Sequence, residues 1–205
     1  MLPDALFTEH KEMNKVYVWD LPTRLFHWTL LGLVVFQWAS AEIGGDLLEY
    51  HLLTGYAIAA LVLFRVVWGF VGGQYARFGN FLRGVGPTLD YARAMRAKTA
   101  ARHLGHNPLG GWMILALLGI LALQIATGLF SNDDIMTEGP LRHLVSDQLS
   151  HLFTEVHELG FNLLMALVAL HVGAVYVYKI FKKEDLIRPM LTGYKQADDE
   201  DAAKQ

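Results

Sequence analysis

The sequence predicts an all-α fold: an integral membrane four-helix bundle with both termini in the cytoplasm. Composition is the first reason, because 53% of the 205 residues are hydrophobic and only 18% are charged. Water-soluble domains of this length seldom have so apolar a composition. The second reason is the presence of four long apolar stretches, and the third is the distribution of Lys and Arg between them.

Four stretches are long enough to span a membrane. A helix needs about 20 mostly apolar residues to cross a hydrocarbon layer about 30 Å thick. The stretches that satisfy this requirement are residues 25–41, 51–72, 111–130 and 156–180. We assign them to a single transmembrane domain, residues 1–195, followed by a disordered acidic tail at residues 196–205.

The basic residues predict the orientation of the bundle. Lys and Arg concentrate before the first stretch, between the second and third, and after the fourth. The connections after the first and third stretches are acidic and contain a single basic residue, Arg142. Because cytoplasmic loops carry an excess of Lys and Arg, we expect the three basic regions in the cytoplasm and the two acidic connections on the outer side.

Composition also excludes several classes of function. The chain has no Cys, which rules out disulfides, thiolate metal sites, iron–sulfur clusters and covalent haem attachment. A net charge of −3 without a basic face argues against a nucleic-acid partner. We find no internal repeat. Among the connections, residues 88–102 are expected to form a short amphipathic helix, and Pro140 is expected to precede another in residues 132–154.

Four histidines lie inside or at the edge of the predicted spans: His27, His51, His157 and His171. An ionisable residue in a membrane costs a few kcal/mol, so each is a candidate functional residue. His157 and His171 are 14 positions apart on one predicted helix, a rise of about 21 Å, and project from the same face. The topology places His51 level with His157 on the outer side and His27 level with His171 on the inner side.

Two levels with two histidines each predict two bis-imidazole sites in the bundle. Neutral imidazole is a good ligand for haem iron, and two axial imidazoles leave no open position for oxygen. This favours electron transfer across the membrane. Zinc fits less well, since tetrahedral zinc sites need three or four ligands close together. The alternative for any single histidine is a hydrogen bond between helices.

Other polar residues near the inner level are candidates for cofactor binding. Arg65 and Arg24 are expected to pair with haem propionates, although Arg65 has the alternative of extending toward the cytoplasmic interface. His106 and Asn107, at the inner end of the third stretch, are candidates for hydrogen bonding to a quinone carbonyl. Asn107, followed by Pro108, is explained equally well as a helix N-cap.

These residues resemble the bacterial cytochrome b561 family, di-haem cytochromes b related to the cytochrome b subunits of nickel–iron hydrogenase and formate dehydrogenase. The resemblance extends over residues 16–193. The motifs that carry it are WDLPTRLFHW (19–28), LFRVVWGFVG (63–72), GHNPLG (105–110) and LHVGAVYVY (170–178). It implies two haems b in a bacterial inner membrane, the inner bound by His27 and His171 and the outer by His51 and His157.

The resemblance also implies a function. The chain is expected to transfer electrons between ubiquinone or menaquinone and a redox partner, either a periplasmic cytochrome c or a dehydrogenase or hydrogenase subunit. The segments SNDDI, EGPL and RPMLTG resemble members that work with di-haem c-type cytochromes. A stand-alone superoxide:quinone oxidoreductase is one alternative, which the acidic outer connections disfavour. A transporter of protons or metal ions without a cofactor is the alternative from another class.

Overall fold

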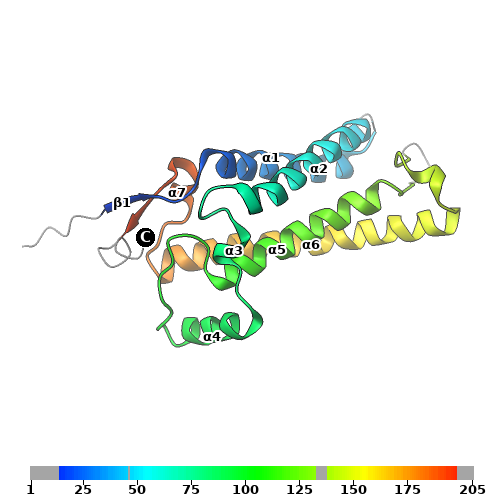
Figure 1. Ribbon diagram of the computed structural model, residues 1–205. Coiled ribbons are helices and arrows are strands. Elements are labelled where there is room, and N and C mark those ends of the chain that lie inside the picture. The colour runs from blue at the N-terminus through cyan, green and yellow to red at the C-terminus, as the bar shows by residue number, and fades with distance from the viewer. Residues whose placement is uncertain (1–13, 46, 133–137, 198–205) are drawn as a thin grey trace, which may run out of the picture.

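Four long helices form the body of the molecule, seen in a computed structural model that describes residues 14–45, 47–132 and 138–197. They are α1 (Leu21–Ile43), α2 (Leu47–Val71), α5 (Pro108–Gly128) and α6 (Asp147–Phe181). α1 packs on α2 and α5 packs on α6, so the chain forms two helical hairpins, joined where α2 contacts α5. Figure 1 shows the two hairpins as two layers that run in the same direction.

Three of the four predicted membrane spans are confirmed by length and hydropathy. Among the described residues, α2, α5 and α6 are long and apolar enough to cross a bilayer. α1 has 23 residues, but they include Arg24, Gln37 and Glu42, which lower its mean hydropathy. A fourth span at α1, and with it the four-helix transmembrane bundle, stays a prediction.

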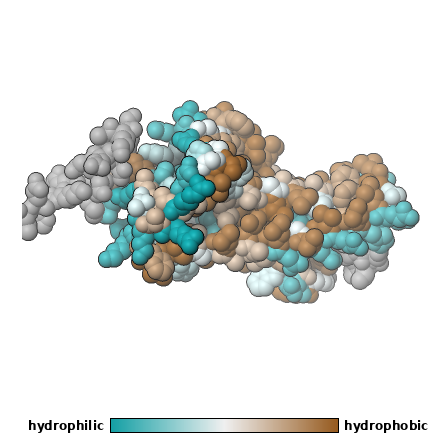
Figure 2. Space-filling model, turned by 90° about the horizontal axis from the view of Figure 1, so that it is seen from below, coloured by the Kyte–Doolittle hydropathy of each residue, from teal (hydrophilic) through white to brown (hydrophobic). Residues whose placement is uncertain are grey.

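Apolar side chains cover much of the outer surface of the helices (Figure 2). Leu63 and Val71 of α2 are 66% and 70% exposed, and Leu159 of α6 is 70% exposed. Leaving large aliphatic side chains exposed is unfavourable in water but not in lipid, where hydrocarbon chains surround them. The surface therefore agrees with the apolar composition.

The two ends of the described chain meet in a small sheet, which the all-α prediction did not include. β1 (Asn14–Tyr17) pairs antiparallel with β2 (Tyr194–Ala197), which follows the short helix α7 (Ile187–Thr192). Gly193 ends α7 with a φ of 89°, a left-handed conformation that favours glycine. β2 includes the first two residues of the predicted tail, and the rest of that tail, residues 198–205, lies outside the described residues.

Short elements occupy the connections. α3 (Phe78–Phe81) and α4 (Val85–Arg96) lie between α2 and α5, and α4 confirms the helix expected at residues 88–102, beginning three residues earlier. After Pro140 the chain forms only one 3-10 turn, η1 (Arg142–Leu144). The separate short helix expected there is wrong, because Ser146 caps a helix that continues unbroken as α6.

Asp20 fixes the start of α1 against the end of α2. Its carboxylate accepts a hydrogen bond of 2.8 Å from Thr23 N, the N-cap interaction, and another of 3.1 Å from Trp68 Nε1. A Cβ on Gly73 would lie 2.6 Å from Asp20 Oδ2, so only glycine fits beside this carboxylate. The motif WDLPTR therefore joins the two helices of the first hairpin at their sheet-side ends.

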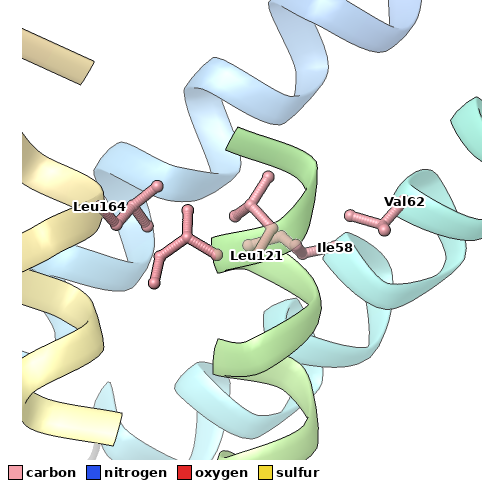
Figure 3. Close-up of a cluster of buried hydrophobic side chains, with 5 residues drawn as sticks. Ile58, Val62, Leu121 and Leu164 are labelled. Atoms are coloured by element: carbon pink, nitrogen blue, oxygen red, sulfur yellow. The ribbon is translucent and has the colours of Figure 1, made fainter. Parts of the chain in front are cut away.

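A layer of apolar side chains joins the two hairpins halfway along the bundle (Figure 3). Along α6, Leu164 lies midway between His157 and His171. The buried members of the layer are Ile58, Val62, Ile120, Leu121 and Leu164, with Leu30, Leu33 and Val34 of α1 packed against them. The core therefore lies between the two levels at which the histidines occur.

Candidate cofactor sites

The four histidines singled out on the long helices lie in two pairs. His27 of α1 and His171 of α6 form the inner pair, at the end of the bundle where the β1–β2 sheet lies, and their ring centroids are 6.4 Å apart. His51 of α2 and His157 of α6 form the outer pair, with the same centroid separation of 6.4 Å. All four side chains are partly buried.

This separation fits one metal ion between two imidazoles. Metal–imidazole bonds are about 2 Å long, so two rings that bind an ion from opposite sides have centroids about 6 Å apart. A direct hydrogen bond of about 3 Å between ring nitrogens would bring the centroids to about 5 Å. The spacing therefore agrees with ligation of haem iron better than with a hydrogen bond between helices. Among the described residues no cluster of three or more His, Asp or Glu could hold a metal ion such as zinc.

The outer pair is bound by hydrogen bonds to the neighbouring helix of each hairpin. His51 Nδ1 lies 3.2 Å from Ser40 Oγ, and the side chain of Gln37 donates to the His51 carbonyl at 2.9 Å. His157 Nδ1 lies 3.0 Å from the carbonyl oxygen of Gln124 and 3.1 Å from Thr127 Oγ1. Both rings are therefore oriented by a residue one helix away.

Within the described residues, the inner pair has no such hydrogen bonds. His27 Nδ1 is buried and has no hydrogen-bond partner among the described residues. The neighbouring ring of Trp28 meets the His27 ring edge-on, with centroids 5.0 Å apart. For His171, the described part of the chain offers a ring contact with His27 but no side-chain hydrogen bond.

Arg65 is a buried cation at the inner end of α2. Its side chain is only 3% exposed, and Nη2 donates to the Ala76 carbonyl at 3.1 Å. Its guanidinium carbon lies 5.0 Å from the centre of the Phe78 ring. Nη1 is buried without a hydrogen-bond partner among the described residues. Since a buried charge is costly unless it is paired, Arg65 fits an anionic group such as a haem propionate.

Arg24 lies one helical turn before His27. Its Nη1 donates to the Leu191 carbonyl at 2.6 Å, which ties α1 to α7. Its Nε is buried and unpaired among the described residues. The unpaired Nε–H of Arg24 is therefore available to a second carboxylate at the inner end.

His106 and Asn107, the candidates for a quinone contact, differ in whether their side-chain polar atoms already have hydrogen-bond partners. Asn107 accepts from Gly110 N at 2.8 Å as the N-cap of α5, and its amide donates to Tyr178 Oη at 2.7 Å. His106 lies between the rings of Trp19 and Phe81, with centroids 4.5 and 4.8 Å away. Burial, with Arg65 and Lys195 nearby, lowers the pKa of His106 to about 3, so its ring is neutral at physiological pH. The capping interpretation of Asn107 is confirmed. His106 Nδ1 is buried and has no hydrogen-bond partner in the part of the chain that the structure describes.

Sequence reasoning missed the residues that contact the outer histidines. They belong to two similar five-residue segments, FQWAS at residues 36–40 and LQIAT at residues 123–127. Each segment contains a Gln and, three positions later, a hydroxyl residue. Each lies on the long helix that precedes the helix of an outer histidine. The separation in sequence from the Gln to the histidine is 14 positions in the first hairpin and 33 in the second. Because these separations differ, the shared pattern is not evident in the sequence.

Comparison with known proteins identifies the class. A model of the family described as prokaryotic cytochrome b561 matches residues 18–193, which include all four long helices and both histidine pairs. The molecule is therefore a multi-pass membrane b-type cytochrome, of a class that binds haem b. The chain belongs to the prokaryotic cytochrome b561 family.

Among the relatives, three align with nearly the whole length of the chain. Two are named "Probable Ni/Fe-hydrogenase B-type cytochrome subunit". The third, from Escherichia coli, is named "Probable Ni/Fe-hydrogenase 1 B-type cytochrome subunit". The protein of Azotobacter vinelandii is 27% identical, over 93% of this chain and 92% of its own length. That of Escherichia coli K12 is 24% identical, over 87% and 90%. That of Rhizobium leguminosarum bv. viciae is 23% identical, over 89% of both chains.

Proposed function

We infer that the chain is a di-haem cytochrome b that transfers electrons across a bacterial inner membrane, between the quinone pool and a redox partner. The observation that carries this inference is the equal spacing of the two histidine pairs, 6.4 Å between ring centroids in each. His27 and His171 would hold the inner haem, and His51 and His157 the outer one. Haem b supplies one-electron chemistry, and the protein supplies ligands, charge and the exclusion of water.

The chain's own residues have distinct roles in this function. The four imidazoles would hold one haem iron at each level, and ligation by two imidazoles favours electron transfer over oxygen binding. Arg65 and Arg24 would neutralise propionates at the inner level. The apolar layer around Leu164 keeps water out of the space between the levels. Among the described residues this layer also separates the polar groups of the two ends, which disfavours proton transport through the bundle.

The partner is inferred from the relatives. Their names associate this family with hydrogenases, and a hydrogenase subunit is the first candidate for the partner. A periplasmic cytochrome c and another dehydrogenase are further candidates. The quinone would bind at the inner end, where His106 has a buried and unpaired nitrogen. The acidic outer residues Glu42, Glu49 and Glu155 disfavour superoxide as a substrate, because they repel an anion.

Haem content tests the ligand assignment. Pyridine haemochrome analysis of the purified protein should give two haems b per chain. Replacing either member of a pair with Ala should remove one haem and leave the other. The absorbance band and midpoint potential of the remaining haem identify which pair was affected. His143→Ala, at an exposed histidine of the outer connection, is the matched control and should retain both haems. A colourless protein, or one haem in the unaltered chain, would contradict the proposal.

Quinol reduction and topology are tested separately. Adding a soluble ubiquinol or menaquinol analogue to the oxidised protein should reduce the haems, and His106→Phe should slow this reduction without loss of haem. Because the natural chain has no Cys, single-Cys variants at Arg96 and His143 report orientation without background labelling. An impermeant thiol reagent should label position 143 in intact spheroplasts and position 96 only after lysis. The reverse pattern would overturn the orientation.

A further inference from the structure

We propose that Ser40 and Thr127 are positioning residues of the outer haem: their hydroxyls accept from the Nδ1–H of His51 and His157, which supports the tautomer that binds iron through Nε2, and they lower the midpoint potential of that haem relative to the inner one. This inference rests on the proposed function, because it assumes that the outer pair binds haem. It concerns residues that do not touch the haem iron and act through its ligands.

At His51 the direction of the hydrogen bond follows from the contacts of Ser40. The Ser40 hydroxyl has one proton, and it donates that proton to the Gln37 carbonyl at 2.9 Å. Toward His51 Nδ1, 3.2 Å away, Ser40 Oγ is therefore an acceptor. Nδ1 must carry the ring proton, so Nε2 carries the lone pair that a metal ion needs.

At His157 the same conclusion follows from different atoms. The Gln124 carbonyl can only accept, so His157 Nδ1 donates to it at 3.0 Å. The Thr127 hydroxyl donates along its own helix to the Leu123 carbonyl at 2.8 Å and so accepts from Nδ1 at 3.1 Å. His157 is therefore also fixed with its proton on Nδ1 and its lone pair on Nε2.

The two hairpins build this arrangement independently. Ser40 is 0% exposed and Thr127 3%, so neither hydroxyl exchanges its partner for water. Glycines on the histidine helices make room for the Gln side chains: a Cβ on Gly55 would lie 3.2 Å from Gln37 Nε2, and one on Gly160 would lie 2.8 Å from Gln124 Oε1. Each hairpin thus provides its own Gln, a hydroxyl residue three positions later and a glycine on the facing helix. Both sets lie at the level of the outer histidines.

The consequence is an asymmetry of potential between the levels. Hydrogen bonds accepted from Nδ1–H raise the basicity of a metal-bound imidazole and favour the more oxidised metal. The outer ligands have these bonds. At the inner level, His27 Nδ1 has no partner among the described residues, and the buried cation Arg65 favours the reduced metal. Both effects place the outer haem below the inner haem in midpoint potential.

Removal of the two hydroxyls tests the inference. In the full-length protein in detergent, the double variant Ser40→Ala/Thr127→Val should keep two haems while the outer midpoint potential rises. We expect about a tenfold change in the reduction equilibrium, which is 59 mV for one electron. The inner potential should not change. The rescue variant Ser40→Thr/Thr127→Ser keeps both hydroxyls and should retain the natural potential.

Thr54→Val is the matched control. Thr54 lies on α2 close to His51, but its hydroxyl lies on backbone carbonyls, that of Tyr50 at 2.7 Å and that of His51 at 3.2 Å, and does not contact the imidazole. Its removal should leave both potentials unchanged. Loss of the outer haem from the hydroxyl-free variant but not from the rescue variant would also support the inference. Two haems with unchanged potentials would overturn it and leave the proposed function intact, whereas a single haem in the unaltered protein would overturn the proposed function itself.

Discussion

The inner and outer histidine pairs have the same spacing but different surroundings. Ring centroids are 6.4 Å apart in both. The outer histidines contact acceptors on the neighbouring helix, whereas His27 Nδ1 has no partner in the described chain and the buried Arg65 lies at the inner end. The inner end also includes the β1–β2 sheet and α7, which tie the two ends of the described chain together.

This contrast indicates that different residues determine where the candidate ligands lie and what surrounds them. Helix geometry alone brings His157 and His171 to one face of α6. The packing of the two hairpins then places each of them near a histidine of the first hairpin. What surrounds each pair depends on residues elsewhere: hydroxyls one helix away at the outer level, and cations at the inner level. Four experiments use this contrast, in order of decreasing effect.

Replacing Arg65 should affect the inner level most strongly. Removing one partner of a buried ion pair costs about 3–5 kcal/mol, so Arg65→Gln should weaken inner haem binding by a factor of about 100 or more. Transfer of haem to apomyoglobin, followed by absorbance, measures this loss. Arg77→Gln changes an exposed arginine nearby and should have no effect. Preferential loss of the outer haem would contradict the placement of Arg65 beside an inner propionate.

The apolar layer should matter equally to both levels. Leu164 is 6% exposed, and Leu164→Ala removes buried methyl groups at a cost of about 3 kcal/mol. Thermal unfolding in detergent, followed at the bands of both haems, should show one lowered transition. Leu163→Ala, at a neighbour that is 52% exposed, should change stability by less than about 0.5 kcal/mol. Separate transitions for the two haems would show that the layer does not couple the levels.

Acidification should destabilise the inner end through His106. Its native pKa of about 3 is below the unfolded value of 6.5, so between these values the unfolded chain binds a proton that the folded chain does not. Stability from neutral His106 is full above pH 6.5 and is lost as pH falls toward 3, by about 2 kcal/mol at pH 5. Unfolding free energies at pH 7 and pH 5 should therefore differ less in His106→Gln than in the natural protein. Equal differences would contradict the burial of His106.

Two glycine substitutions should give the smallest effects, with opposite signs. Gly160→Ala places a Cβ 2.8 Å from Gln124 Oε1, so that flexible amide must move, and about 1 kcal/mol of stability should be lost at the outer level. Gly173→Ala meets nothing within 4 Å and should gain up to about 1 kcal/mol through helix propensity. A loss of inner haem from Gly173→Ala would instead show that the macrocycle lies against this glycine.

Much of the helical framework was predictable because apolar runs report burial in lipid. The runs located α2, α5 and α6 to within a few residues at most ends, and Asn107 with Pro108 marked the start of α5. The start of α6 was misplaced by nine residues, because the extension from Asp147 is polar and carries no membrane signal. The β1–β2 pairing was missed for a similar reason. Its two strands have only four residues each and lie far apart in sequence, so no local pattern predicts their pairing.

Local composition and the fixed rise of a helix set which residues can lie in lipid and which histidines share a helical face, so both could be predicted from the sequence. Tertiary structure alone decided what each histidine contacts. Ser40 meets His51 and Thr127 meets His157 only because each hairpin folds its helices together, and the unpaired nitrogens of His27, Arg65 and His106 appear only once the surrounding helices are packed. Hydrogen-bond partners depend on distances between elements, which no local sequence pattern specifies.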